Sequence, residues 1–211
     1  MPVALASDFC SLRSGWTERS LHSLSDDRWG ALEKYERLLY DWSGKMNLVS
    51  RSERNLIATR HIWRGLALAR LIEARAPRTI IDVGSGAGIP GVPIKICLPD
   101  VEIYLVESRR KRANFLRTVV RELALKRIHV VNERIENWDN GVSADIFTAR
   151  AVAQPNILQN LLTNHTTGEA TLVCTLSKDV EEGEMASGEI RRVTWGGQSM
   201  KVGLFPMAYQ Q

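Results

Sequence analysis

The chain has 211 residues, of which 44% are hydrophobic and 25% are charged, so it can form one sizeable α/β domain with an appendage. Its three cysteines, Cys10, Cys97 and Cys174, lie far apart and have no histidines at ligand spacing, which disfavours a disulfide framework and a zinc site. We therefore expect no metal and a reducing compartment. Because the sequence contains no signal-like start and no long uncharged apolar stretch, we expect a cytoplasmic protein without a membrane partner.

The formal net charge is +4 and the basic residues are clustered. Six of them lie between residues 109 and 121 with no acid among them, and a second basic segment spans residues 51–75. Acidic residues gather at 179–189, which we expect to be a loop. This pattern favours a polyanionic partner on one face, although a solvated helix face would give the same clustering.

The N-terminal third of the chain predicts helices. Residues 1–24 are Ser-rich and predict a loosely ordered extension. Apolar residues then recur at helical spacing from Trp29 to Trp42. Ser50 and Glu53 form a capping-box pattern before a second helix with the apolar stripe Leu56, Trp63, Ala67 and Leu71. Residues 25–76 therefore predict an N-terminal helical lobe.

Strands and helices alternate after Pro77. Strands are predicted at 79–83, 102–107, 127–132, 144–149 and 170–176, and helices at 91–98, 109–124 and 155–164. Residues 190–195 and 201–205 predict a closing antiparallel hairpin. This order predicts an α/β fold with a mostly parallel sheet, helices on both faces and one core over residues 77–211. With the helical lobe it would form a single domain overall.

Residues 80–91 have the sequence IIDVGSGAGIPG, a buried strand followed by a glycine turn and a helix. A dinucleotide site requires G-x-G-x-x-G, whereas Gly84, Gly86 and Gly88 are spaced G-x-G-x-G and Ile89 occupies the third-glycine position. Asp82 would repel a pyrophosphate but suits the amino group and sulfonium of S-adenosylmethionine. The alternatives are an NAD-binding oxidoreductase and a tight strand-helix junction without a ligand.

Glu107 follows the next predicted strand, 23 residues after Gly84. A carboxylate at this place can accept hydrogen bonds from both hydroxyls of an unphosphorylated ribose. The residue therefore supports an adenosine ligand, whether NAD or S-adenosylmethionine. A surface acid at a strand end is the alternative.

Three motifs together resemble a known family. They are residues 82–91 (DVGSGAGIPG), residues 107–116 (ESRRKRANFL) and residues 150–153 (RAVA). They are similar to the GidB/RsmG family, the bacterial 16S rRNA guanine-N7 methyltransferases. Trp42, Asn47 with Leu48, and Arg60 with His61 also fall where that family carries similar residues, and the likeness covers about residues 30–178.

The resemblance implies a class I, Rossmann-like methyltransferase that uses S-adenosylmethionine and acts on 16S rRNA or the small ribosomal subunit as a monomer. The implied cofactor residues are Asp82, Gly84, Gly86, Gly88, Ile89, Glu107, Ile135, Glu136 and Arg150. The implied catalytic residues are Arg150, His61 and Asn47. The implied RNA-binding residues are Arg60, Arg109, Arg110, Lys111, Arg112, Arg117 and Lys178.

The chain departs from the family pattern on the substrate side. Arg64-Gly65 replaces the usual Asp-Ser after the Arg-His pair, Ala149 replaces a common Ser, and Asp179 stands where a Gly usually follows the Lys. Two alternatives therefore stay open: a methyltransferase acting on another RNA or a small molecule, and a non-catalytic RNA-binding relative.

Guanine N7 has a free lone pair, so no general base is needed before methyl transfer. We expect alignment to dominate catalysis, with Arg150 positioning the base. A salt bridge from Arg150 to Asp145 or a neighbour is the alternative. For His61 the alternative is a structural side chain with a satisfied partner, and for the 109–112 cluster a solvated basic face.

Overall fold

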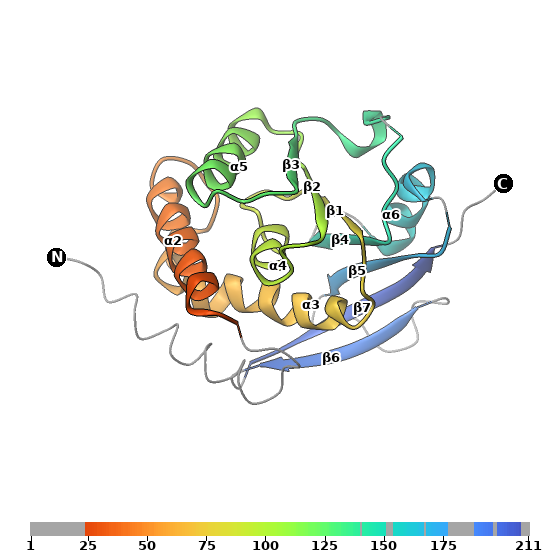
Figure 1. Ribbon diagram of the computed structural model, residues 1–211, viewed down its shortest axis with the longest axis horizontal. Helices are drawn as coiled ribbons and strands as arrows, with labels where there is room; N and C mark the ends of the chain where they lie inside the picture. Colours follow the sequence, from red (N-terminus) through yellow and green to blue (C-terminus); the bar gives the residue numbers. More distant parts are fainter. Residues whose placement is uncertain are drawn as a thin grey trace.

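The computed structural model describes residues 24–139, 141–150, 154–166, 168–176, 188–195 and 198–207, and its centre is one seven-stranded sheet (Figure 1). The strands lie in the order β3-β2-β1-β4-β5-β7-β6. The first five strands in this order are parallel to one another, and β7 is antiparallel to both β5 and β6. Their bounds are β1 Thr79–Val83, β2 Glu102–Val106, β3 Ile128–Val131, β4 Ile146–Arg150, β5 Ala170–Leu176, β6 Glu189–Trp195 and β7 Gln198–Met207.

Helices pack on both faces of the sheet, as the alternation predicted. The described helices are α2 Asp26–Ser43, α3 Trp63–Glu73, α4 Gly91–Cys97, α5 Arg110–Glu122 and α6 Pro155–Leu162. One hydrophobic cluster joins α2, α3, α4 and α5 to one face of the sheet, and a second joins α6 to the other (Figure 1). Because the crossovers on the two sides of β1 use opposite faces, β1 lies at the switch point where open α/β sheets bind ligands.

The strands confirm most of the sequence-based bounds. Two strands, 79–83 and 170–176, begin and end where predicted, and most of the others differ by one or two residues at their ends. The last strand, β7, begins three residues before and ends two residues after its predicted bounds. The hairpin is also confirmed, with β6 paired to β7 along its whole length. The two strands with matching bounds, β1 and β5, are mostly buried and rich in β-branched residues, so local pattern and tertiary environment agree there.

The second helical segment differs from the prediction. The Ser50 hydroxyl donates to the Glu53 carboxylate at 3.1 Å and does not cap a backbone amide. A 3₁₀ turn (η1, Arg51–Leu56) and a π turn (η2, Ala58–Ile62) precede α3. Because these turns change the helical repeat, a stripe spaced for 3.6 residues does not stay on one face. Leu56, predicted to be buried, is 37% exposed.

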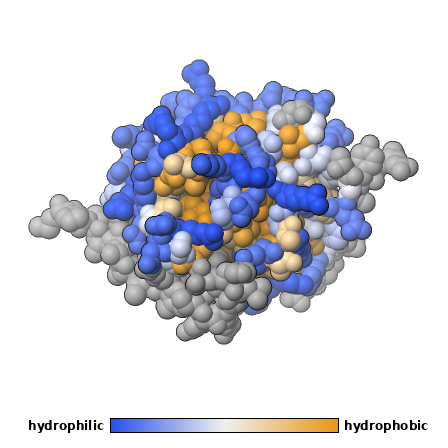
Figure 2. Space-filling model, in the orientation of Figure 1, coloured by the Kyte–Doolittle hydropathy of each residue, from blue (hydrophilic) through white to orange (hydrophobic). Residues whose placement is uncertain are grey.

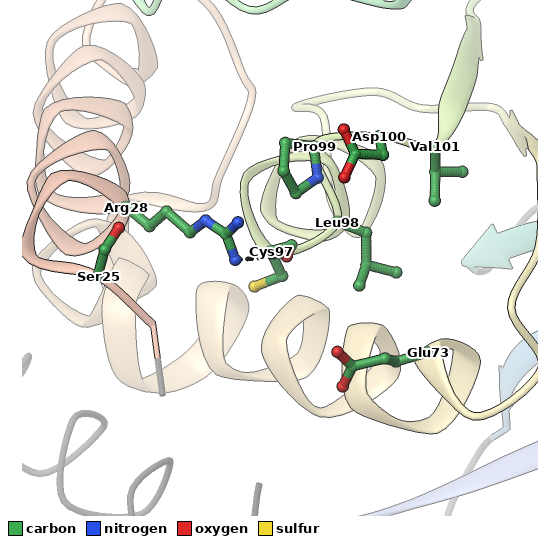
Figure 3. A pocket seen from close by; sticks show the side chains of 8 residues that line it. All are labelled: Ser25, Arg28, Glu73, Cys97, Leu98, Pro99, Asp100 and Val101. Atoms are coloured by element: carbon green, nitrogen blue, oxygen red, sulfur yellow. Dashed lines mark hydrogen bonds between the residues drawn. The ribbon is translucent and has the colours of Figure 1, made fainter. Parts of the chain in front are cut away.

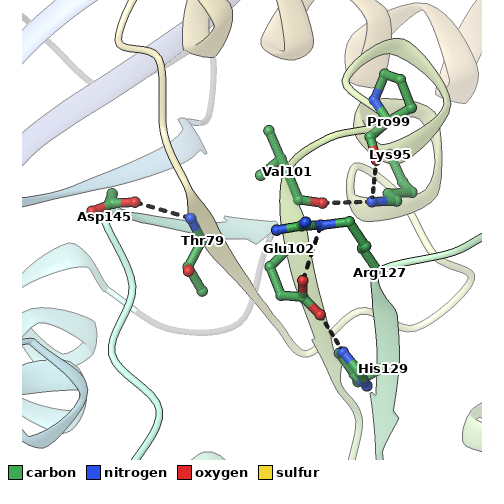
Figure 4. Close-up of polar contacts among 8 residues, drawn as sticks. All are labelled: Thr79, Lys95, Pro99, Val101, Glu102, Arg127, His129 and Asp145. Carbon is green, nitrogen blue, oxygen red and sulfur yellow. Dashed lines mark hydrogen bonds and ion pairs between the residues drawn. The ribbon is translucent and has the colours of Figure 1, made fainter.

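Polar contacts tie the strands together at their amino ends (Figure 4). Asp145 accepts the backbone amides of Arg78 and Thr79 at 2.7 and 2.9 Å. Lys95 donates to two backbone carbonyls before β2, and Glu102 contacts Arg127 and His129 (Figure 4). Asp145, just before β4, therefore accepts hydrogen bonds from backbone amides. Arg150 lies at the other end of β4, and the salt bridge between Arg150 and Asp145, which was the alternative prediction, is not formed.

Some predictions lie outside the described residues. They concern the extension before residue 24, Ala151 to Ala153, and the acidic loop with Lys178 and Asp179.

Within the described ranges, no helix is long and apolar enough to span a membrane. Figure 2 shows hydrophobic residues near the centre of the viewed face, inside a mainly hydrophilic rim.

Candidate functional site

The glycine turn lies at the carboxyl end of β1, between β2 and β4. Gly84, Gly86 and Gly88 have φ angles of 65°, 58° and 89°, a region that side chains disfavour. A Cβ added at Gly88 would lie 2.7 Å from Val92, whereas one at Gly86 would meet no atom closer than 3.6 Å. Gly84 is exposed and Gly86 half-buried, so the first part of the turn offers open backbone to a ligand.

Asp82 lies beneath this turn with 1% of its surface exposed. Its Oδ1 accepts a hydrogen bond from the Thr148 hydroxyl at 2.7 Å, and within the described chain its buried Oδ2 has no hydrogen-bond partner of good geometry. Burial raises the pKa of Asp82 to about 6, although Thr148, Ser85, the Gly91 amide and Arg150 all act to lower it. The carboxylate therefore carries a poorly compensated negative charge under the turn, which suits a cationic ligand group.

Glu107 lies beside the turn at the end of β2 and is 4% exposed. Its Oε2 accepts the amide of Gly86 at 2.9 Å, and its Oε1 accepts the amide of Arg109 at 2.7 Å. Each carboxylate oxygen keeps a second lone pair, so both can still accept a ribose hydroxyl. Glu107 thus shapes the turn and retains the acceptors that an adenosine ligand requires.

Arg150, at the end of β4, contacts His61 from the lobe. Its guanidinium lies 3.3 Å from His61 Nδ1, and His61 Nε2 lies 3.5 Å from a Glu53 carboxylate oxygen. Because a guanidinium can only donate, Nδ1 accepts and the imidazole proton lies on Nε2, toward Glu53. Burial, and then Arg150, lower the pKa of His61 to about 4, so the ring is neutral at pH 7.

Two residues that the sequence did not single out also belong to this region. Tyr35 of α2 donates its hydroxyl to the carbonyl of Ala87 in the turn at 2.6 Å. Burial raises the pKa of Tyr35 above its ordinary value, and the charges of Arg150 and Asp82 act on it. Tyr35 was predicted only as part of an apolar stripe, and Thr148 only as a strand residue. Nothing in the local pattern distinguishes either from a packing residue.

The remaining predicted residues are more dispersed. Ile135 is buried in a 3₁₀ turn (η3, Ile135–Asn137) after β3, and Glu136 beside it is exposed. The carbonyl of Asn47 accepts from Arg112 at 3.4 Å, and Arg112 also lies against the Gly86 region. This contact brings the lobe loop to the start of α5. It also places Arg112 nearer to the glycine turn than the RNA-binding prediction implied.

The basic cluster lies at the amino end of α5. Arg109, Arg110, Lys111 and Arg117 are exposed, and Leu116 and Val119 are buried on the opposite side. Cations in the first turn of a helix oppose its dipole, so the cluster is unfavourable for the isolated helix.

Among the described residues, no group of three or more acidic, His or Cys side chains could hold a metal ion.

A cavity of about 420 Å³ lies elsewhere, between the start of α2 and the end of α4 (Figure 3). Arg28 crosses it to the carbonyl of Cys97 at 3.1 Å (Figure 3). Glu73 and Asp100 line it together with apolar side chains. This cavity is at the amino-end side of the strands, so it is separate from the glycine turn.

The sheet order, the glycine turn at the switch point and the acids after β1 and β2 define a class I methyltransferase fold. A methyltransferase structure from Geobacter sulfurreducens has a similar fold, with a TM-score of 0.59 and 14% identity over 89% of this chain and 99% of that one. Residues 29–200 match the family model described as GidB, rRNA small subunit methyltransferase G. The chain belongs to this family.

Curated relatives carry the name ribosomal RNA small subunit methyltransferase G. One from Bacillus velezensis is 38% identical over 66% of this chain and 60% of its own length. One from Geobacillus thermodenitrificans is 32% identical over 90% of this chain and 81% of its own length. The match to the first thus spans less than two thirds of that relative.

Proposed function

We propose that this protein transfers a methyl group from S-adenosylmethionine to N7 of a guanine in 16S rRNA. The observation that carries the proposal is the buried, poorly compensated Asp82 beneath an open glycine turn. A dinucleotide pyrophosphate would be repelled there, whereas the amino group and sulfonium of S-adenosylmethionine are attracted. Glu107 beside the turn supports ribose binding, and membership of the methyltransferase G family supports the rRNA substrate.

S-adenosylmethionine, when bound, supplies the electrophilic methyl group. The residues around it have to hold the guanine in line, and good alignment is worth roughly 7 to 11 kcal/mol of the barrier. Neutral His61 accepts a hydrogen bond from Arg150 and so orients the guanidinium. Arg150 positions the base through hydrogen bonds to its acceptors. It does not stabilise the product charge, because N7 methylation makes the ring cationic.

Replacing Arg150 tests this positioning role. Arg150→Ala should lower turnover by about 100-fold, because small misplacements of the reacting groups have effects of that order. Single-turnover methyl transfer to 16S rRNA measures the change, with the exposed Arg192→Ala as the matched control. The role is refuted if Arg150→Ala changes neither turnover nor cofactor affinity.

Two experiments test the proposal as a whole. Calorimetry with S-adenosylmethionine and with NAD separates a methyltransferase from an oxidoreductase, and we expect binding of the former alone. Mapping N7-methylguanine in 16S rRNA, from cells with and without the gene, then identifies the substrate. Unchanged N7 methylation, despite cofactor binding, would favour another RNA or a small-molecule acceptor.

We also propose that the protein acts as a monomer in the cytoplasm, on free 16S rRNA or on the small subunit. Among the described residues, the large hydrophobic side chains that are clearly exposed are Leu56 and Ile157, which supports a monomer. Light scattering of the purified protein, together with activity on both RNA forms, tests this. A stable dimer at micromolar concentration would contradict it.

A further inference from the structure

Three arginines lie close enough to His61 for their charges to act on it. Arg60 comes from the π turn η2, Arg64 from the first turn of α3, and Arg150 from the end of β4. Arg150 contacts the ring of His61 directly, and the charges of Arg60 and Arg64 also act on it. The chain thus brings like charges together from two separate parts of the fold.

This group is not neutralised by the described residues around it. Glu53 supplies one negative charge, which acts on both His61 and Arg64. His61 is neutral and adds no charge of either sign, so one carboxylate faces three guanidinium groups. The buried Nε of Arg64 has no hydrogen-bond partner in the described part of the chain. Burial, followed by the charge of Arg150, lowers the pKa of Arg64. Arg64 and Arg150 are half-buried, and like charges in that setting are unfavourable unless an anion joins them.

The position of the group indicates which anion it would bind. Arg150 acts electrostatically on Asp82 and Tyr35 at the turn, and also on Arg64. Arg60 is exposed on the lobe, and Arg64, four residues further along the chain, is half-buried. An anion that reaches both arginines therefore has to come from the solvent side of the lobe. A phosphate of an RNA strand whose target guanine lies at Arg150 meets this requirement.

The local backbone supports a binding role. Arg60 and His61 lie within a π turn, a rare and less stable arrangement that occurs often at functional sites. A Cβ added at the next glycine, Gly65, would lie 2.5 Å from Pro93, so α3 is held tightly against α4 at this point. Close packing of the helix gives Arg64 a fixed origin, and a planar guanidinium matches phosphate oxygens in pairs.

We propose that Arg60 and Arg64 form a phosphate-binding subsite for the RNA backbone, beside Arg150 and separate from the basic start of α5. This inference rests on the proposed function for the identity of the RNA. The subsite neutralises a phosphate next to the target guanine and so helps to place the base at Arg150.

The test measures binding of a 16S rRNA transcript to full-length protein across a salt series. Arg64→Gln should reduce the slope of log affinity against log salt by about 0.7, the value for one phosphate contact on a single strand. At 0.1 M salt that slope corresponds to about fivefold weaker binding. Arg60→Gln should behave similarly, and Arg64→Lys should retain most of the slope.

Arg70→Gln is the matched control, because Arg70 lies on the same helix and the substitution removes the same charge. Calorimetry with S-adenosylmethionine alone should give the same affinity for wild type, Arg64→Gln and Arg70→Gln. Thermal melts of each variant verify that the fold is retained. A lost phosphate contact lowers the slope of log affinity against log salt. A general loss of stability would not lower that slope for Arg64→Gln alone.

The remaining outcomes separate a failure of the subsite from a failure of the proposed function. Equal salt slopes for Arg64→Gln and Arg70→Gln would overturn the subsite, and active wild-type enzyme would leave the proposed function intact. Weaker cofactor binding with an unchanged RNA slope would assign the arginines to the cofactor carboxylate instead. Conversely, an Arg64-dependent slope in a protein that methylates no guanine N7 would support the subsite and refute the proposed function.

Discussion

At the scale of single residues, the site depends on where two acids lie. The sequence identified Asp82 because an acid at the glycine turn would repel a pyrophosphate, and Glu107 because an acid after the next strand can accept hydrogen bonds from a ribose. The structure adds that Asp82 is buried against Thr148, whereas both oxygens of Glu107 hold backbone amides. Two carboxylates with similar sequence signals thus have different environments, and burial raises the pKa of Asp82.

We predict that cofactor affinity depends on the ionisation of Asp82. Because burial raises its pKa to about 6, Asp82 loses its charge as the pH falls through that value. The ionised fraction decreases about tenfold between pH 7 and pH 5, so affinity for S-adenosylmethionine should weaken by up to about tenfold. His61, with a pKa of about 4, stays neutral across this window. Calorimetry from pH 5 to pH 7 measures the effect.

Asp82→Asn should bind weakly and should show no pH dependence over the same range. The stability effect of Asp82 has the opposite sign. Its folded pKa is raised from 3.8, so its ionisation destabilises the fold as the pH increases through about 6. Titration of Asp82 therefore does not unfold the protein at pH 5. A pH-independent affinity in the wild type would refute the prediction.

At the scale of elements, local sequence pattern predicts the glycine turn but not the segment from Ser50 to Trp63 in the N-terminal lobe. The turn is predictable because its glycines adopt positive φ angles. The segment from Ser50 to Trp63 has a helical pattern, yet it forms a 3₁₀ turn and a π turn. Contacts with other elements, such as that between His61 and Arg150, are visible only after folding and can outweigh the regular repeat.

We predict that Gly88→Ala is much more damaging than the same change at another positive-φ glycine. Left-handed backbone costs a side chain about 1 to 2 kcal/mol at either place. At Gly88 the new Cβ would also lie 2.7 Å from Val92, and overpacking adds about 1 to 3 kcal/mol. Gly141, with φ of 72° and no atom within 4 Å of an added Cβ, is the matched control.

Denaturant unfolding of both variants measures the difference in the free energy of unfolding. We expect Gly141→Ala to lose about 1 to 2 kcal/mol and to keep cofactor affinity. Gly88→Ala should lose more stability and bind S-adenosylmethionine poorly, since the turn would be displaced. Equal losses for the two variants would show that the contact with Val92 is unimportant.

At the scale of the whole molecule, the lobe and the core share one interior. Residues of α2 and α3 belong to the same hydrophobic cluster as β1 and β2, and Tyr35 reaches the glycine turn. We propose that residues 25–76 and 77–211 fold as one unit, in which the lobe completes the cofactor site.

Tyr35→Phe tests this coupling of lobe and turn. Losing the hydroxyl leaves the buried carbonyl of Ala87 without this donor, at a cost of about 1 to 3 kcal/mol of stability. Because that carbonyl is part of the turn, affinity for S-adenosylmethionine should also decrease. Tyr40→Phe, on the same helix, keeps the ring that packs against Arg54 and is the control. The coupling would be refuted if both variants bound the cofactor like the wild type.

The sequence alone determined the fold class, the sheet elements and the cofactor turn, because strand burial and glycine conformation are properties of short segments. It also indicated Asp82 and Glu107 from their places at the ends of two strands, and Arg150 through the family resemblance. Only the tertiary structure decided how these residues meet His61, Tyr35, Thr148 and Arg64. Those contacts join positions up to 89 residues apart, and their geometry depends on how the lobe packs on the sheet.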